Sequence, residues 1–226
     1  MDDSIEKMFE EKNISILINK LNLDIDNNSN SVELTLKLRI PLLKNKLIRK
    51  ISRFFNEENI EYTISDIDEI VSKRESIVLN TIMKLVNERK ASLSNAVSDN
   101  SYITQEKIVD LIHKITIEFR EKLNVEMNNE IFIELNNILS EKYLLKNEEV
   151  KEKQSQIFAN YDNEIENSII NIVEERNRIL INQINDTYSQ YRSLNEKTGV
   201  SHEKSSSDLG NTKTANKYSK ALHLES

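Results

Sequence analysis

Residues 21–40 alternate between apolar and polar side chains on either side of a polar run. Leu21, Leu23 and Ile25 are separated by polar residues, and from Val32 to Ile40 every second residue is apolar. A strict period of two is typical of a strand with one buried face. The polar run 27–31 (NNSNS) between the two segments is rich in turn-forming residues. The pattern therefore predicts a β-hairpin.

A helix and a third strand are predicted to follow this hairpin. Pro41 suits the first position of a helix because its missing N–H costs nothing there, and the apolar spacing after it predicts a helix over 41–56. Residues 60–64 then alternate again and predict a short strand. A two-stranded hairpin is only marginally stable alone. We therefore expect residues 1–64 to form a small ββαβ unit.

Residues 65–194 contain no Gly or Pro and have apolar residues at helical spacing, which predicts long helices. One helix should extend to about residue 90, followed by a loop rich in Ser and Asn over 91–103. The run 104–194 holds a single apolar residue, Val150, between 146 and 156, so we expect it to break near 146–149. The arms would then fold into an antiparallel bundle or coiled coil, which we favour over one extended rod.

The last part of this run has an 11-residue apolar period, in which Phe158, Ile169 and Leu180 recur. Such a period is typical of an almost straight helix seam. Arg176 and Gln183 interrupt it, so a strong autonomous coiled coil is not expected. The predicted seam consists of Phe158, Tyr161, Ile165, Ile169, Ile172, Leu180, Ile184 and Tyr191.

Composition supports a mainly α fold that begins with a small α+β unit. The 226 residues include only 2 Gly and 1 Pro, too few for many tight turns. Both glycines lie beyond residue 195, in a segment rich in Ser, Thr and Lys. That segment has little to bury. We expect three parts: the ββαβ unit (1–64), the long helices (65–194) and a disordered tail (195–226).

Charge is unevenly distributed. The whole chain has a net charge of −7, but residues 34–56 contain seven cations and no acid. The seven are Lys37, Arg39, Lys44, Lys46, Arg49, Lys50 and Arg53. Such a surface can bind phosphates, an acidic protein or an anionic membrane. It can equally be a solvated face whose cations pair with acids of the same chain.

Catalytic, metal-binding and phosphate-binding motifs are not evident. There is no Cys, and the three histidines (His113, His202 and His223) are far apart in sequence. No Gly precedes Gly199, so a glycine-rich phosphate loop is close to excluded. We expect no cofactor and no metal, and we do not expect an enzyme.

These observations predict a helical oligomerisation, scaffolding or adaptor protein. Its long helices would mediate self-association or partner binding, and the basic segment would dock an anionic partner. The alternative is a nucleic-acid-binding accessory protein that uses the same basic helix. Neither a signal peptide nor an 18-residue apolar run is evident. A cytoplasmic location is therefore expected, with membrane binding unlikely.

Overall fold

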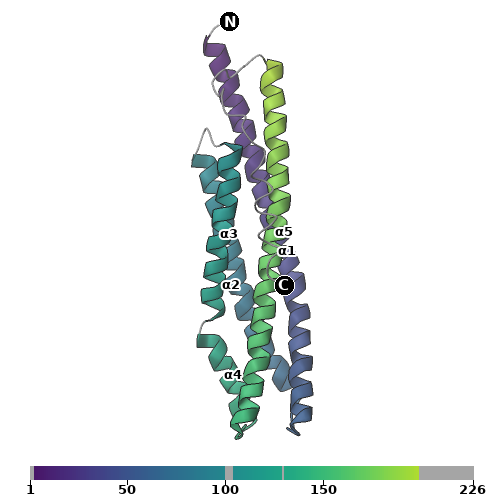
Figure 1. The fold of residues 1–226 in the computed structure, drawn as a ribbon. Helices are drawn as coiled ribbons and strands as arrows, with labels where there is room; N and C mark the ends of the chain where they lie inside the picture. Colours follow the sequence, from purple (N-terminus) through teal and green to yellow (C-terminus); the bar gives the residue numbers. More distant parts are fainter. Residues whose placement is uncertain (1–2, 100–103, 129, 199–226) are drawn as a thin grey trace, which may run out of the picture.

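The computed structural model describes residues 3–99, 104–128 and 130–198, and within them it is a long bundle of helices (Figure 1). The helices are α1 (Asp3–Glu57), α2 (Ile64–Asp99), α3 (Gln105–Met127), α4 (Glu130–Lys142) and α5 (Glu148–Thr198). Helices α1 and α5 run antiparallel side by side. Helix α2 packs antiparallel to α1, and α3 and α4 follow one another alongside α2. The predicted helical bundle is confirmed.

The predicted ββαβ unit is wrong, because α1 is one helix across it and the described residues contain no strand. In the alternating run, Val32, Leu36 and Ile40 are buried, whereas Leu34 and Leu38 are 61% and 66% exposed. The run therefore contains a helical stripe with a spacing of four. That stripe runs from Leu17 to Phe55 and faces α2 and α5. A short hairpin could not bury so long a stripe.

The residues expected to make turns are inside α1. Asn28 and Ser29, from the predicted turn 27–31, are buried at 4% and 3% exposure. Pro41 lies in the middle of the helix. Because it has no N–H, it cannot bond the carbonyl of Lys37, one turn earlier. The burial of apolar side chains on both sides of Pro41 explains how the helix continues through it.

The predicted third strand, 60–64, is the connection between α1 and α2 and the first residue of α2. Asn59, two residues after the end of α1, adopts the left-handed conformation (φ 54°), and Ile60 N donates to Phe55 O at 2.8 Å. Thr63 caps α2, since its hydroxyl accepts from Asp66 N at 3.2 Å. Ile60 and Tyr62 are partly buried against the core. Their alternation therefore reflects a packed connection.

The later boundaries follow the sequence in part. Helix α2 continues to Asp99, through most of the predicted loop 91–103, and residues 100–103 lie outside the described part. The predicted break near 146–149 is present between α4 and α5. Leu144 there adopts φ 48°, and Asn147 Oδ1 accepts from Glu149 N at 2.9 Å. The break between α3 and α4, which follows Asn128, was not predicted.

Most of the predicted disordered tail, 195–226, lies outside the described residues, which end at 198. Its first residues belong to α5. Asn195 is buried there and accepts a hydrogen bond at 2.8 Å from Asn13 Nδ2 of α1. The sequence-based boundary was therefore placed slightly too early.

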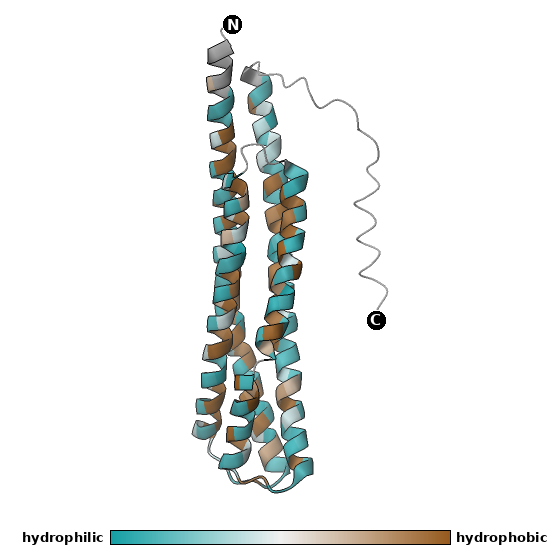
Figure 2. Ribbon diagram, turned by 90° about the vertical axis from the view of Figure 1, so that its left-hand side faces the viewer, coloured by the Kyte–Doolittle hydropathy of each residue, from teal (hydrophilic) through white to brown (hydrophobic). Residues whose placement is uncertain are grey.

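The core is mainly aliphatic, with buried aromatic residues such as Phe55 and Phe158, and it forms two clusters along the bundle. The larger joins α1 from Val32 onward to α2, α4, the end of α3 and the first half of α5. The smaller cluster lies at the opposite end of the bundle and includes Leu21 of α1 and Ile184 of α5. Figure 2 shows the hydrophobic positions spread along all the helices. No helix among the described residues is long and apolar enough to cross a membrane.

Candidate partner-binding surface and buried polar layers

Most cations of the basic segment are held by acids of the same chain. Lys44 Nζ lies 3.1 Å from Asp68 and 3.7 Å from Glu75. Lys46 and Lys50 both pair with Glu164 of α5, and these two lysines lower the pKa of that carboxyl. Such pairs connect α1 to α2 and α5, and the exposed pairs of Lys46 and Lys50 with Glu164 each add little stability.

Two further cations are also engaged. Lys37 pairs with Glu33 one turn earlier on α1. Arg39 Nε donates to Ser168 Oγ at 3.3 Å. Only Arg49 and Arg53, among the seven cations, have neither an ion pair nor a hydrogen bond within the described residues. Both are exposed, so they are the two charges that a partner could bind without breaking an existing contact.

Three leucines lie on the same outer face of α1 as these two arginines. Leu34, Leu38 and Leu42 are 61%, 66% and 60% exposed. At 3.6 residues per turn, the five residues fall within about 100° of one another around the helix axis. We call this set, Leu34, Leu38, Leu42, Arg49 and Arg53, the α1 strip. A contiguous exposed apolar row next to unpaired charge is typical of an interaction surface.

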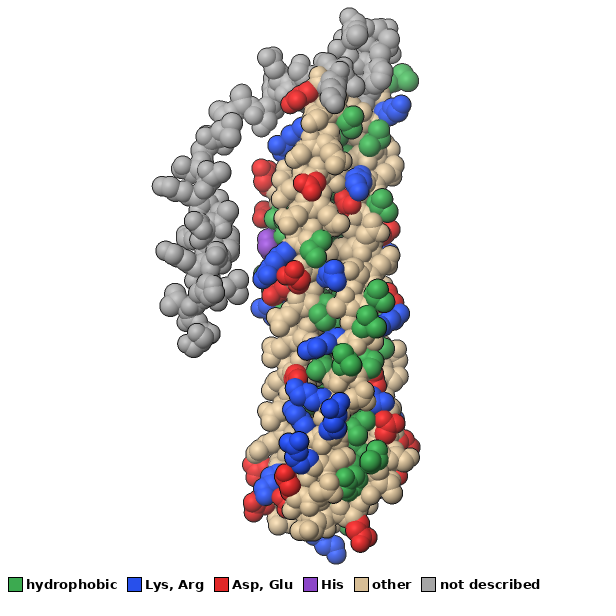
Figure 3. All heavy atoms as spheres, turned by 90° about the vertical axis from the view of Figure 1, so that its right-hand side faces the viewer, with side chains coloured by type: hydrophobic (Ala, Val, Ile, Leu, Met, Phe, Trp, Pro, Cys, Tyr) green, Lys and Arg blue, Asp and Glu red, His purple; other side chains and the backbone are tan. Residues whose placement is uncertain are grey.

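Figure 3 shows the side of the molecule on which the C-terminal half of α1 lies. Hydrophobic side chains form a broken line along it, and Lys and Arg side chains gather in its lower half. A groove of about 370 Å³ between α1 and α5 lies on the molecular surface, lined by Thr35 and Arg39 of α1 and by Ser168 and Arg176 of α5, among others. Thr35 and Arg39 each follow a leucine of the strip. Apolar, basic and concave surface therefore adjoin one another here.

The predicted seam residues of α5 face the bundle. Six of them are buried: Phe158, Tyr161, Ile165, Ile169, Leu180 and Ile184. Ile172 and Tyr191 are partly buried against the two core clusters. The seam packs against α1, α2 and α3 of the same chain. These residues are therefore occupied within the bundle rather than exposed for a partner.

A buried arginine, Arg74 of α2, forms a polar layer inside the lower half of the bundle. Its side chain is 1% exposed and both oxygens of Asp162 accept from its Nη2. Its Nη1 donates to Phe132 O at 3.0 Å and to Asn136 Oδ1 at 3.2 Å, and its guanidinium lies 4.6 Å from the centre of the Phe132 ring. Burial raises the pKa of the Asp162 carboxyl, and the Arg74 charge opposes that rise.

A second buried arginine, Arg89, lies 15 residues further along α2 and has no acid partner in the described part of the chain. Its Nη2 donates to Asn28 Oδ1 at 3.2 Å and to Asn177 Oδ1, while Nε and Nη1 have no partner among the described residues. Burial lowers its pKa to about 10. Uncompensated buried charge of this kind costs stability.

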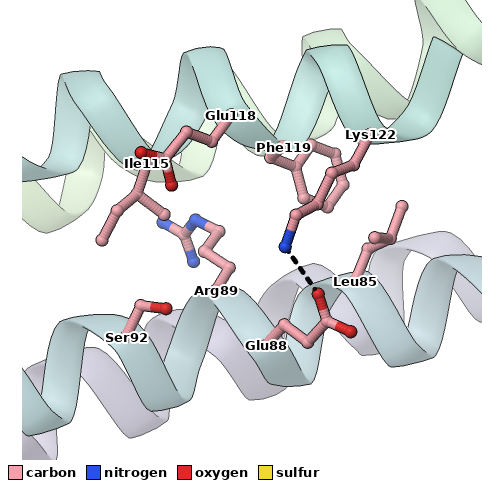
Figure 4. A pocket seen from close by; sticks show the side chains of 8 residues that line it. All are labelled: Leu85, Glu88, Arg89, Ser92, Ile115, Glu118, Phe119 and Lys122. Carbon is pink, nitrogen blue, oxygen red and sulfur yellow. Dashed lines mark hydrogen bonds and ion pairs between the residues drawn. The ribbon is translucent and has the colours of Figure 1, made fainter. Parts of the chain in front are cut away.

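Arg89 lines a small cavity of about 20 Å³ between α2 and α3 (Figure 4). Lys122 of α3 bonds Glu88 of α2 across its mouth at 2.9 Å, and this contact lowers the pKa of Glu88 and raises that of Lys122. The space suits about one water molecule. It is too small for an organic ligand.

These polar layers were missed at the sequence level, although a signal for them is present. Arg74 and Arg89 occupy positions in the apolar stripe of α2 where an apolar residue is expected, and both are buried. Asp24 of α1 is buried in the same way and accepts from Thr187 Oγ1 at 2.8 Å. The sequence signal for each layer is therefore a polar residue at a position where the apolar stripe of the helix would have an apolar one.

No group of three or more His, Asp or Glu side chains that could hold a metal ion occurs among the described residues. Fold and surface together define an elongated, antiparallel, all-helical bundle with an outward amphipathic strip on its first helix. Comparison with family models, curated proteins and solved structures finds no match for this chain.

Proposed function

We propose that this protein is a non-enzymatic helical scaffold or adaptor that docks an anionic partner along α1. The observation that carries the proposal is the α1 strip, in which three exposed leucines continue into Arg49 and Arg53, two cations without an ion pair in the described part of the chain. The strip spans about 28 Å at 1.5 Å per residue. It therefore fits a partner helix that presents an apolar stretch followed by acids.

The rod shape supports this role. Polar contacts inside the bundle connect α1, α2 and α5 at three levels: Arg74 with Asp162, Arg89 with Asn28, and Thr187 with Asp24. Hydrogen bonds of this kind fix the register of packed helices, because a shift would leave buried polar groups without partners. A bundle held in one register presents its outer strip as a rigid surface, and rigidity lowers the entropic cost of binding.

Photo-crosslinking in the cell that makes the protein tests the proposal. A photoreactive residue at position 38 should form adducts with a specific protein, and Arg49→Glu combined with Arg53→Glu should abolish them. The control places the same group at Lys73, an exposed residue of α2 outside the strip. Absence of adducts at position 38, or equal adducts at both positions, would refute docking by the strip.

The nucleic-acid alternative stays a prediction. Four of the seven cations already pair with acids of the chain, so binding a phosphate backbone would compete with these contacts. An electrophoretic shift with duplex DNA and with RNA at two salt concentrations decides it. A shift at low salt that disappears with Arg49→Glu and Arg53→Glu would favour nucleic acid over a protein partner.

A further inference from the structure

Helix α3 has an outer face that complements the α1 strip. Ile117 and Val125 are 60% and 72% exposed, and Glu106, Asp110 and Glu121 are exposed beside them. These five residues also fall within about 100° around their helix axis. None of the three acids forms an ion pair within the described residues. We call this set the α3 strip.

The two strips match residue by residue when the helices are antiparallel. In the register that places Leu42 opposite Ile117, Leu34 lies opposite Val125. In the same register Arg49 lies opposite Asp110. The spacing of eight residues between the apolar positions is equal on the two helices, as is the spacing of seven from the last leucine to Arg49 and from Asp110 to Ile117. Both apolar pairs and this charge pair therefore form together.

The ends of the register also fit. Arg53 lies opposite Glu106, while Leu38 lies opposite Glu121, whose aliphatic stem can cover it. A shift by one helical turn in one direction brings Arg49 opposite Lys114. A shift by one turn in the other direction leaves one apolar pair, Leu38 with Ile117, and brings Leu42 opposite His113. Complementarity thus selects one register among its neighbours.

The α1 and α3 strips of one molecule cannot satisfy one another. Helices α2 and α5 both pack against α1 and against α3, so α1 and α3 occupy opposite corners of the bundle. The two strips are exposed and face outward on different sides. We therefore infer that the partner of the α1 strip is the α3 strip of a second copy of this chain, packed antiparallel with Leu42 opposite Ile117.

This contact is heterologous, since two different surfaces meet. Each molecule keeps a free α3 strip at one side and a free α1 strip at the other, so addition continues into an open array of alternately inverted bundles. One pair of helix faces is a small interface, so the association is weak and depends on protein concentration. The inference rests on the proposed function, because it names the partner of the same strip.

Disulfide trapping tests the register directly, because the chain contains no Cys. A chain with Leu42→Cys is mixed with a chain with Ile117→Cys under mild oxidation. A crosslinked pair of chains is expected. The matched control replaces Ile117→Cys with Val125→Cys, which moves the thiol about 12 Å along α3 and should give little product. Equal yields in the two mixtures, or none in either, would overturn the register.

A charge swap supplies a second, independent readout. Arg49→Glu should weaken self-association, measured by sedimentation velocity, by roughly tenfold, and adding Asp110→Arg should restore it. Lys73→Glu changes the net charge equally on another exposed face and should have no effect. Circular dichroism confirms folding of each variant. Failure of Asp110→Arg to rescue would count against the contact.

The two proposals fail in different ways. If position 38 crosslinks in the cell to a different protein and the disulfide does not form, the α1 strip is a docking surface and the second copy is refuted. If position 38 crosslinks to this chain and the disulfide forms, both stand. If neither crosslink forms, both are refuted.

Discussion

Arg74 and Arg89 lie on the same face of α2, and replacing each with methionine should have opposite consequences. Methionine keeps much of the side-chain volume and removes the charge. Arg74→Met leaves the Asp162 carboxylate without its cation, and it also removes donors from Phe132 O and Asn136 Oδ1. Breaking a buried ion pair from one side costs about 3–5 kcal/mol. We expect a loss of stability of that size.

Arg89→Met strands no acid, because the partners of Arg89 are the side-chain oxygens of Asn28 and Asn177. Both amides keep a second bond: Asn28 Nδ2 donates to Arg176 O, and Asn177 Nδ2 donates to Thr116 Oγ1. Loss of each of these two hydrogen bonds should lower the free energy of unfolding by roughly 1 kcal/mol. Removal of an uncompensated buried charge offsets this loss. The net change should lie within about 1 kcal/mol of zero.

Urea denaturation followed by far-UV circular dichroism measures both variants. The free energy of unfolding should fall by at least about 2 kcal/mol more for Arg74→Met than for Arg89→Met. Combining Arg74→Met with Asp162→Leu should recover part of the loss, because the stranded carboxylate is removed. Equal losses for the two single variants would refute the distinction between a paired and an unpaired buried arginine.

The pH dependence sharpens the comparison. Burial already raises the pKa of Asp162, and loss of Arg74 removes the contact that opposes the rise. A carboxyl whose folded pKa exceeds its unfolded value destabilises the protein above that pKa and stops doing so once protonated. The deficit of Arg74→Met should therefore shrink between neutral pH and about pH 4.5. The stability change of Arg89→Met should not vary over this pH range.

Four further substitutions test the fold. Pro41→Ala restores a donor to the Lys37 carbonyl and should stabilise the protein by about 1–3 kcal/mol in urea melts; a loss would contradict a continuous α1. Tyr161→Phe removes a buried hydroxyl without a partner in the described residues and should be neutral or slightly stabilising. Burial raises the pKa of Tyr161, so the folded state holds the phenolic proton more tightly than the unfolded state does. Above about pH 10 the native chain should therefore lose more stability than Tyr161→Phe does. Denaturation at alkaline pH measures the difference. Leu36→Ala should cost about 2–5 kcal/mol, and Leu38→Ala less than about 0.5 kcal/mol, so similar losses would argue against the observed burial.

The helical bundle and the break before α5 could be predicted because both depend on apolar spacing and on the scarcity of Gly and Pro. The N-terminal strands could not be distinguished from helix by alternation alone. Val32, Leu36 and Ile40 satisfy both a period of two and a spacing of four, and the stripe that continues on both sides decided for the helix. Pro41 was a misleading signal, since packing outweighed its local preference.

The basic segment was found from the sequence, but the state of its cations was not. Lys46 and Lys50 are 118 and 114 residues from Glu164, and only the antiparallel packing of α1 on α5 brings them together. Alternation places Leu34 and Leu38 of the α1 strip on the apolar face of a strand, and Leu42 falls in the helix predicted over 41–56. Their exposure follows only from the helical geometry, so the strip appeared once the helix was known.

A cysteine accessibility scan of positions 32–42 tests most directly whether the outer face of α1 is a docking surface. Each position is replaced singly with Cys in this Cys-free chain, and the rate of alkylation is measured. In dilute purified protein we expect fast labelling at 34, 38 and 42 and slow labelling at 32, 36 and 40; in the cell, the three fast positions should become protected. Equal rates at all even positions, or fast labelling at 34, 38 and 42 in the cell, would contradict the account.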